Sequence, residues 1–216
     1  MFASIRRYRL HSGSMDELAR RVDGGFAEQL SAQPGFVSYE FLDCGDGDVL
    51  TISVFRDADG ARRSRALAQR WTDENLGDFE FTRREALQGE ILVSRAAAEL
   101  LEPGHAGAAG RFASLRRYGM ASGSVAELMR SVDDIFADEI AALDGFVAYH
   151  VLDCGGGEVL SLSLLRDEAT ARETDEMALR FVTERLTRFG LQRTDAVAGR
   201  VLVSRAVAEM LEPTHA

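Results

Sequence analysis

The chain has 216 residues, of which 46 % are hydrophobic and 28 % are charged, close to the averages of globular domains and unlike a disordered or fibrous sequence. Its 35 acidic and 25 basic side chains give a formal charge of −10, which argues against nucleic-acid binding, because such surfaces gather cations. Every basic side chain is Arg, so the chemistry of a Schiff-base lysine or a P-loop lysine is excluded.

The sequence also predicts that the chain stays out of membranes. No stretch approaches the roughly 18 consecutive apolar residues of a transmembrane helix, and the first ten residues lack the apolar segment of a signal peptide. We therefore expect a cytoplasmic protein, in which a reducing environment keeps Cys44 and Cys154 as thiols.

The chain contains one unit written twice. The segment FASIRRYRLHSGSMDEL, from Phe2, recurs at an offset of 110 as FASLRRYGMASGSVAEL, from Phe112, and the match continues to the end of each copy without a gap. A repeat of this length is a tandem duplication rather than a solenoid. We predict a first domain over residues 1–103, a linker rich in Gly and Ala over 104–111, and a second domain over 112–216.

Hydrophobic periodicity within each copy predicts the order strand, helix, strand, strand, helix, strand. The expected elements of the first copy are a strand at 2–10, a helix from an S-x-x-E capping box at Ser14 to Pro34, strands at 36–43 and 49–55, a helix at about 58–79 and a short strand at 90–94. The second copy carries the same signals 110 residues later.

This order is typical of a ferredoxin-like βαββαβ unit, an α+β fold with both helices on one face of four antiparallel strands. The strand at 49–55 and its copy have apolar or small residues at every position, which predicts burial on both faces. We therefore expect the two bare sheet faces to pack together and close an intramolecular dimeric α+β barrel, present as a monomer or at most as a dimer of these pseudo-dimers.

Four motifs carry a resemblance to a known group: R-R-Y from Arg6, P-G-F-V-x-Y from Pro34, the D-x-G-D-G hairpin from Asp43, and Trp71 late in the second helix. Together they resemble the antibiotic biosynthesis monooxygenase superfamily of dimeric α+β barrels, over nearly all of both copies. The superfamily includes cofactor-independent oxygenases of aromatic polyketides and quinols, haem-degrading oxygenases, small-molecule isomerases and members without known activity. The resemblance therefore implies a fold more firmly than a reaction.

The haem-degrading branch of the superfamily does not match. Its pattern has an Asn in the first strand, a Trp on the second helix and a His about ten residues later. Here Arg6 stands at the Asn position, Trp71 is Phe181 in the second copy, and neither 80–81 nor 190–191 contains a His. Without an axial imidazole, iron lacks a proximal ligand, so we expect no haem, no metal and no other cofactor.

The cofactor-independent branch requires only an apolar cleft and a cation, because a deprotonated phenol or anthrone can pass an electron to O₂ directly. A buried Arg stabilises that anion, and we name Arg6 and Arg116 as catalytic candidates. The alternative interpretation is structural: each Arg forms an ion pair with an acidic helix residue, and the nearby aromatic side chains belong to the hydrophobic core. The substrate-binding candidates on the same strand face and on the second helix are Tyr8, Tyr118, Trp71 and Phe181.

One titratable position differs between the copies, because Glu40 corresponds to His150. His takes protons near neutral pH, and Glu does so when burial raises its pKa. We predict that His150 is a catalytic base in the second cleft and that Glu40 lies at the substrate site of the first. The alternative is that both are exposed edge positions. We assign no role to the remaining histidines, His11, His105 and His215.

The leading hypothesis is a cofactor-independent monooxygenase that acts on an aromatic, quinol or polyketide-type small molecule. The alternative is a non-catalytic small-molecule-binding or stress-related protein of the same fold, and a third hypothesis is an isomerase that depends on His150. The acidic residues around the first hairpin, from Asp43 to Asp48, lack the spacing of a calcium loop and are expected to be a solvated turn.

Overall fold

The computed structural model describes residues 1–101 and 110–216, so most of the predicted linker at 104–111 lies outside the described residues. The first unit consists of β1 (Phe2–Ser12), α1 (Met15–Arg21), η1 (Val22–Ala27), α2 (Glu28–Ser31), β2 (Phe36–Asp43), β3 (Asp48–Phe55), α3 (Ala58–Asn75), β4 (Glu80–Ala96) and η2 (Ala98–Leu101). The second consists of β5 (Phe112–Gly119), α4 (Val125–Ser131), η3 (Val132–Phe136), α5 (Ala137–Ala141), β6 (Phe146–Gly155), β7 (Glu158–Leu165), α6 (Glu168–Arg185), η4 (Thr187–Phe189), β8 (Gln192–Ala206) and η5 (Ala208–Leu211).

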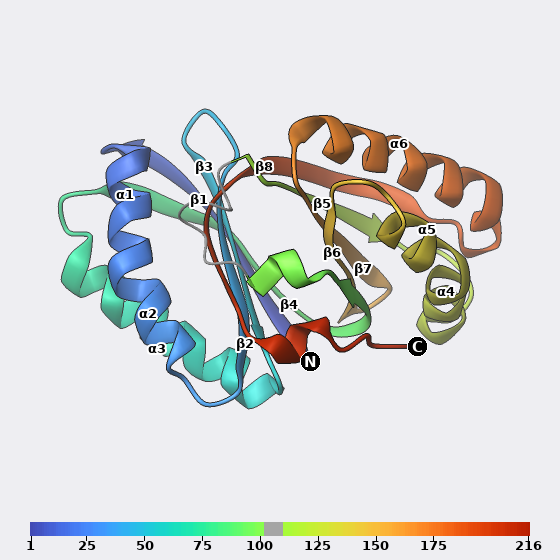
Figure 1. Cartoon of the computed structure of the whole chain (residues 1–216), viewed down its shortest axis with the longest axis horizontal. Coiled ribbons are helices and arrows are strands. Elements are labelled where there is room, and N and C mark those ends of the chain that lie inside the picture. The colour runs from blue at the N-terminus through green and yellow to red at the C-terminus, as the bar shows by residue number, and fades with distance from the viewer. Residues whose placement is uncertain (102–109) are drawn as a thin grey trace.

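The strands form a closed antiparallel barrel in the order β1-β3-β2-β8-β5-β7-β6-β4. The helices of the first unit cover one side of this barrel and those of the second unit cover the opposite side (Figure 1). The predicted α+β fold, with two ferredoxin-like units closing on each other, is confirmed.

The last strand of each unit is much longer than the sequence predicts. Instead of a short strand at 90–94, β4 begins at Glu80; it pairs with β1 up to Glu90 and with β6 of the other unit from there to Ala96. In the same way β8 pairs first with β5 and then with β2. The first part of β4 is mostly exposed, so its sequence carries polar residues and no hydrophobic alternation. Backbone pairing with a neighbouring strand, which leaves no hydrophobic signal in the sequence, therefore determines this part of the strand.

Each long strand also brings a cation under the helices of the opposite unit. Arg95 of β4 donates to Asp133 of η3 at 2.8 Å and to Asp138 of α5 at 3.0 Å. The equivalent pair on the other side joins Arg205 of β8 to Asp23 of η1. These ion pairs repeat with the pseudo-two-fold symmetry and join the strands of one unit to the helices of the other.

Apolar side chains fill the barrel and also line the space between each sheet and its helices. The interior contains Ile52, Leu50 and Val54 from the first unit and Leu160, Leu162 and Leu164 from the second. All residues of β3 from Val49 to Phe55 are buried, as the sequence predicts. Because the barrel interior is packed, space for a ligand is left on the outer faces of the sheets, under the helices.

The first helix of each unit begins at its predicted cap and contains a π-helical segment in the middle. Ser14 accepts a hydrogen bond from the backbone N–H of Glu17, and Ser124 forms a reciprocal capping box with Glu127. The π segments are η1 and η3. Both copies have one although only the first copy has a Gly pair in it, so the glycines are not its cause.

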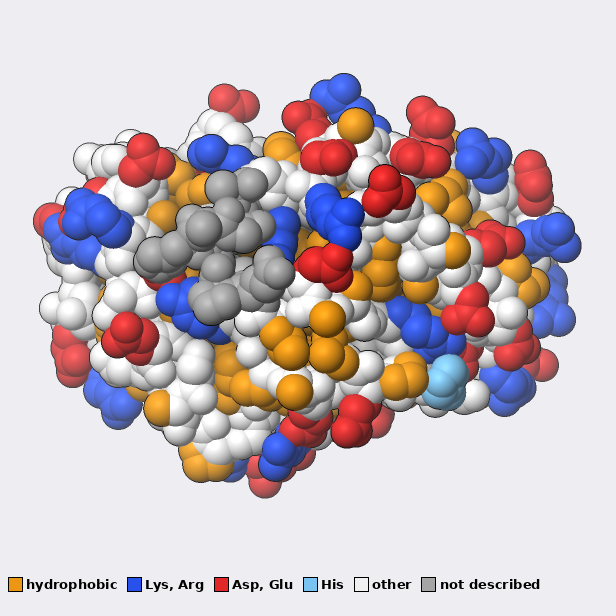
Figure 2. Space-filling model, in the orientation of Figure 1, with side chains coloured by type: hydrophobic (Ala, Val, Ile, Leu, Met, Phe, Trp, Pro, Cys, Tyr) orange, Lys and Arg blue, Asp and Glu red, His pale blue; other side chains and the backbone are white. Residues whose placement is uncertain are grey.

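The surface carries charges of both signs, and Figure 2 shows acidic and basic side chains interspersed over one face. Among the residues that the structure describes, no helix has the length and apolar character needed to cross a bilayer. Cys44 and Cys154 are free thiols, and burial raises the pKa of each to about 12.

Two glycines allow the long strands to pass from one unit to the other. A Cβ added to Gly89 would lie 2.8 Å from the carbonyl oxygen of Asp153, and one added to Gly199 would lie 2.6 Å from that of Asp43. We expect Gly199→Ala to lower the free energy of unfolding by about 2 kcal/mol, the usual cost of a backbone shift from overpacking. Urea denaturation followed by circular dichroism measures this change.

Gly24→Ala is the matched control. Gly24 is an exposed helical residue whose added Cβ would meet no atom within 4 Å, so Ala there should raise the free energy of unfolding by about 0.5–1 kcal/mol. Equal effects of the two substitutions would contradict the role of Gly199 at the junction.

Candidate functional site

The first unit contains a cleft between its sheet and its helices. The cavity has a volume of about 70 Å³, and its walls come from β1, β2, β3 and β4 on one side and from the first helix and α3 on the other. Most of the lining is aromatic or aliphatic. The polar lining residues are Arg6, Tyr8, Tyr39, Thr51 and Thr72. The cleft therefore combines an apolar body with a few polar groups, which is typical of small-molecule sites.

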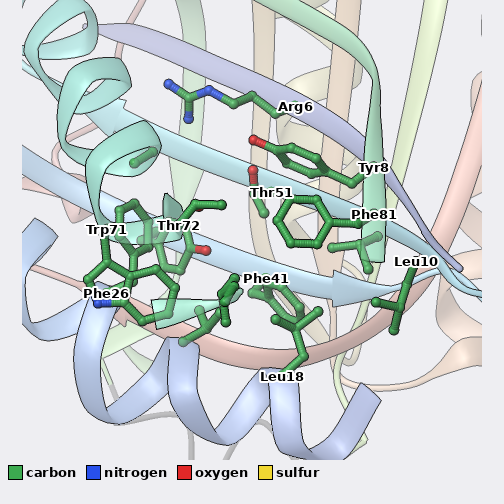
Figure 3. Close-up of a pocket in the computed structure, with 15 residues that line it drawn as sticks. Arg6, Tyr8, Leu10, Leu18, Phe26, Phe41, Thr51, Trp71, Thr72 and Phe81 are labelled. Carbon is green, nitrogen blue, oxygen red and sulfur yellow. The ribbon is translucent and has the colours of Figure 1, made fainter. Parts of the chain in front are cut away.

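Figure 3 shows Arg6, Tyr8 and Thr51 toward one end of this cleft and Trp71 and Phe26 toward the other. Arg6 of β1 lies opposite Thr51 of β3 in the strand register, and the hydroxyl groups of Tyr8 and Thr51 lie on the Arg6 side. Trp71 of α3 packs on Phe26 at the other end, with ring centroids 5.5 Å apart. The structure therefore brings together the predicted site residues Arg6, Tyr8 and Trp71.

Trp71 approaches the first helix closely because that helix has a Gly at the contact. A Cβ on Gly25 would lie 3.1 Å from the indole ring. In the second copy Ile135 and the smaller ring of Phe181 replace this pair. In the first copy, therefore, the missing side chain of Gly25 makes room for the large indole ring of Trp71.

Arg6 is a buried cation that no carboxylate of the described part of the chain pairs with. Its residue is 4 % exposed, and its Nη2 atom is buried without a hydrogen-bond partner among the described residues. Burial lowers the pKa of Arg6, the nearby hydroxyl groups of Tyr8 and Tyr39 oppose this shift, and the positive charges of Arg65 and Arg83 add to it. A guanidinium still stays charged in proteins, so a positive group lines the cleft.

The second unit has a smaller cleft, of about 40 Å³, whose lining includes Tyr118 and Phe181 but not Arg116. Arg116 is fully buried; its Nε donates to Asp175 at 2.7 Å and its Nη1 donates to the Ser163 hydroxyl at 3.2 Å. Here the alternative interpretation, an Arg paired with an acidic helix residue, describes the contacts.

Asp175 is held as an anion between two cations. Burial raises its pKa, but the hydrogen bond from Arg116 and the charges of Arg116 and Arg193 outweigh burial, so the pKa of Asp175 lies below its ordinary value. Arg193 donates to the same carboxylate at 3.2 Å. The buried guanidinium of the second unit is therefore neutralised within the protein.

The first unit has a cation where the second has Asp175. At the offset of 110, Asp175 corresponds to Arg65, and Arg193 corresponds to Arg83. The two copies thus share the buried Arg of the first strand but differ in the residue that faces it. Sequence reasoning missed Arg65 and Arg83, although a comparison of the copies position by position would have found the change of charge on α3.

These arginines surround the mouth of the first cleft. Arg65 and Arg83 line an open hollow of about 280 Å³ together with Arg6 and Tyr8, and the rest of its lining comes from Ala68, Gln69, Thr72 and Phe81. Phe81 packs edge-on against Tyr8, with centroids 5.9 Å apart, between this hollow and the inner cavity.

Glu40 and His150 do not lie in the clefts. Each is 4 % exposed and faces the barrel interior, where both line a cavity of about 10 Å³. Alternation along β2 directs Tyr39 toward the helices and Glu40 the opposite way. His150 therefore does not provide a base in the second cleft, Glu40 is not at the substrate site of the first, and neither is an exposed edge residue. Because both faces of these strands are buried, the sequence pattern did not distinguish them.

Both interior groups are neutral near pH 7. Burial raises the pKa of Glu40 to about 8, against a hydrogen bond from the Ser204 hydroxyl at 3.0 Å. Burial also lowers the pKa of His150 to about 4, and its Nδ1 lies 3.0 Å from the Ser94 hydroxyl. Their contacts are those of core residues.

Neither cleft suits haem. The described residues that line the two clefts include no His, Cys or Met, the usual axial ligands apart from Tyr. Burial raises the pKa of Tyr8 and of Tyr118, which disfavours the phenolate that iron would need. Among the described residues no group of three His, Cys, Asp or Glu side chains is placed to hold a metal ion.

The different partners of Arg6 and Arg116 predict opposite effects on stability. Asp175→Asn removes the charge that neutralises Arg116 and should lower the free energy of unfolding by about 1–3 kcal/mol, less than for a fully buried pair because Asp175 is partly exposed. Arg65→Asp supplies Arg6 with the carboxylate that it lacks and should raise the free energy of unfolding. Urea titrations of both variants measure this, and a loss of stability in Arg65→Asp would contradict it.

Glu40 predicts a pH dependence with a definite sign. Its folded pKa of about 8 lies above the unfolded value of 4.5, so the folded state keeps its proton longer and loses stability as the pH rises from 4.5 to 8. The Glu40→Gln variant should therefore gain stability over the wild type between pH 5 and pH 8, by on the order of 2–4 kcal/mol. Thermal melts across this range measure the difference, to which His150 contributes equally in both proteins. Parallel profiles would contradict ionisation of a buried Glu40.

Comparison with known proteins gives one family match and several similar structures. Residues 1–71 match the family model described as antibiotic biosynthesis monooxygenase. This segment includes Arg6, Tyr8 and Trp71. No curated protein sequence matches the chain.

The similar structures span both units. A "putative monooxygenase" from Fusobacterium nucleatum is 6 % identical, with a TM-score of 0.72 over 95 % of this chain and 94 % of the other. A "putative monooxygenase" from Lactobacillus acidophilus is 11 % identical, with a TM-score of 0.67 over 100 % of this chain and 98 % of the other. An "anthrone oxidase-like protein" is 12 % identical, with a TM-score of 0.56 over 97 % and 94 %. At these identities the likeness is one of fold. Residues 1–71 are therefore similar in sequence to the antibiotic biosynthesis monooxygenase family, and the fold of the whole chain is similar to that of structures described as monooxygenases.

Proposed function

We propose that this protein is a cofactor-independent monooxygenase that acts on an aromatic, quinol or polyketide-type small molecule in the cleft of its first unit. One observation carries the proposal: the guanidinium of Arg6 is buried beside an apolar, aromatic cleft, and no carboxylate in residues 1–101 and 110–216 forms an ion pair with it. An unpaired buried charge lowers stability, so a site that keeps one has a use for it when a substrate oxygen becomes negative.

The lining of the first cleft determines which chemistry the protein supplies. Its described residues include no carboxylate and no imidazole, so the protein has no general base at the apolar end. The substrate must be acidic enough to ionise with the help of Arg6, and its proton leaves to water at the open mouth. An enol or phenol with a stabilised anion fits this requirement.

Oxygen chemistry follows from that anion. The anion passes one electron to O₂, and the resulting radical and superoxide combine in a carbon–oxygen bond. Loss of the second hydrogen of that carbon with cleavage of the oxygen–oxygen bond gives a carbonyl group and water. One atom of O₂ enters the product and the other leaves as water, so the two hydrogens of the substrate carbon account for the reduction and no further reductant is needed.

The other polar residues of the cleft orient the ligand. Burial raises the pKa of Tyr8, although the charges of Arg6 and Arg83 oppose the shift, so its hydroxyl remains a hydrogen-bond donor at neutral pH. Thr51 adds a second hydroxyl from the neighbouring strand, on the same side of the cleft. Trp71 provides the flat wall on which an aromatic ring stacks.

The comparisons support the class of reaction and leave the substrate as our proposal. The family match covers residues 1–71, which include Arg6, and one similar structure is described as anthrone oxidase-like. The isomerase hypothesis requires His150 as a base in a cleft, but His150 lies in the barrel interior. A non-catalytic binding protein remains as the outcome of a failed activity test.

Oxygen uptake tests this proposal. With 1,8-dihydroxyanthrone as the probe, the wild type should consume O₂ in the presence of a chelator. Arg6→Gln should lower kcat by about 10²–10³, the usual cost of removing one group that stabilises an oxyanion. The matched control is Arg193→Gln, an exposed Arg of the second unit that should leave kcat unchanged.

Two outcomes would overturn the proposal. Uptake no faster than that of the probe alone, with the probe still bound, would mean a binding protein. Full activity in Arg6→Gln would remove the role of that residue.

We also infer that the chain works as a monomer. Both halves of the barrel come from one polypeptide, and each long strand already pairs across the two units. Light scattering after size exclusion, with an expected mass of 23.7 kDa, checks this inference.

A further inference from the structure

We propose that the first cleft selects aromatic molecules that carry an ionised carboxylate, held at the mouth by Arg65 and Arg83, and that Asp175 closes the second cleft to such ligands. The proposal deepens the function proposed above and rests on it for the reaction, but its binding claim stands on the geometry of the mouth.

Three arginines meet at one hollow. Arg6, Arg65 and Arg83 line it together, and its described lining contains no acidic residue. Arg65 comes from α3, and Arg83 lies directly across from Tyr8 in the pairing of β1 with β4. Like charges at one place repel one another. This concentration of positive charge occurs in a chain whose net charge is −10. An anion that binds among them removes this repulsion.

The second unit shows how a carboxylate fits at the equivalent place. There the carboxylate of Asp175 accepts from the buried Arg116 at 2.7 Å and from Arg193 at 3.2 Å. Since Arg6 and Arg83 are the equivalents of these two donors, the first unit keeps both donors and lacks the acceptor. A ligand carboxylate at the mouth would accept from Arg83 as Asp175 accepts from Arg193, with Arg65 as its second donor.

The position of the arginines also sets the orientation of the ligand. Arg65 and Arg83 are exposed at the mouth, whereas Arg6 is buried and lines both the mouth and the inner cavity. A ligand with its carboxylate at the mouth extends its ring past Tyr8 toward Trp71. Because Arg6 lines both spaces, it lies beside the part of the ligand between the acid and the ring.

The single Trp of the sequence makes the first cleft separately observable. Trp71 lines that cleft, and nitroaromatic compounds quench indole fluorescence on contact. We would titrate the protein with 4-nitrobenzoate and with 4-nitrobenzamide, which have the same ring and differ in charge, at one fixed ionic strength. The wild type should bind the acid at least ten times more tightly than the amide.

Arg65→Asp recreates in the first unit the arrangement of the second. It should weaken binding of 4-nitrobenzoate at least tenfold and leave binding of 4-nitrobenzamide within about twofold, and Arg83→Gln should weaken binding of the acid to a smaller extent. Arg193→Gln is the matched control for Arg83→Gln and should change neither. Equal affinities for acid and amide in the wild type, or unchanged binding of the acid by Arg65→Asp, would overturn the proposal.

The reverse substitution tests the claim about the second cleft. Asp175→Arg should add a second site for 4-nitrobenzoate, so that calorimetry counts two acids per chain where the wild type binds one. Asp175→Asn, which keeps the size of the side chain, serves if the Arg variant does not fold and should show weaker binding at the same second site. One acid per chain in a folded variant would contradict the role of Asp175.

The two proposals fail in different ways. Selective binding of the acid without O₂ uptake would support the carboxylate site and end the oxygenase proposal. Uptake of O₂ that Arg6→Gln lowers, together with equal affinities of the wild type for 4-nitrobenzoate and 4-nitrobenzamide, would support the oxygenase and end the carboxylate site.

Discussion

Closure of the barrel is the constraint on which the rest of this structure depends. Each unit presents a sheet whose second face is apolar, and the two faces can leave water only against each other. The long strands β4 and β8 complete the closure, because each pairs with its own unit at one end and with the other unit at the other end. The barrel interior thereby becomes core, and the two apolar clefts lie beneath the helices.

The duplication then allows two equivalent clefts to differ. Both inherit a buried Arg on the first strand, and in each case a buried cation requires an anion. In the second unit Asp175 provides that anion permanently. In the first unit Arg65 occupies the equivalent place, and the residues that the structure describes give Arg6 no anionic partner. The two clefts thus differ by one change of charge on the second helix of the unit. In the second unit the protein itself neutralises the buried Arg, and in the first unit a ligand would do so. The second unit neutralises its buried charge within the fold, whereas the proposed function would use the charge of the first unit to stabilise a substrate anion.

Glu40 and His150 show that equivalent positions of the two copies also differ inside the barrel, away from both clefts. Glu40 and His150 each have a serine partner from a strand of the opposite unit and are neutral near pH 7. Groups of this kind have shifted pKa values, which elsewhere indicate functional sites, yet here the shifts result from burial in the core. Their position, and not their pKa, decides how they are interpreted.

Sequence alone determined the tandem repeat, the βαββαβ order, the caps at Ser14 and Ser124, and the burial of both faces of β3, because these depend on local patterns of apolar and capping residues. It also selected Arg6, Tyr8 and Trp71. Only the tertiary structure decided the length of β4, which depends on pairing with other strands, and the face on which Glu40 and His150 lie, since both faces are buried. The partner of Arg116 comes from a helix 59 residues further along the chain, so only folding brings the two charges together.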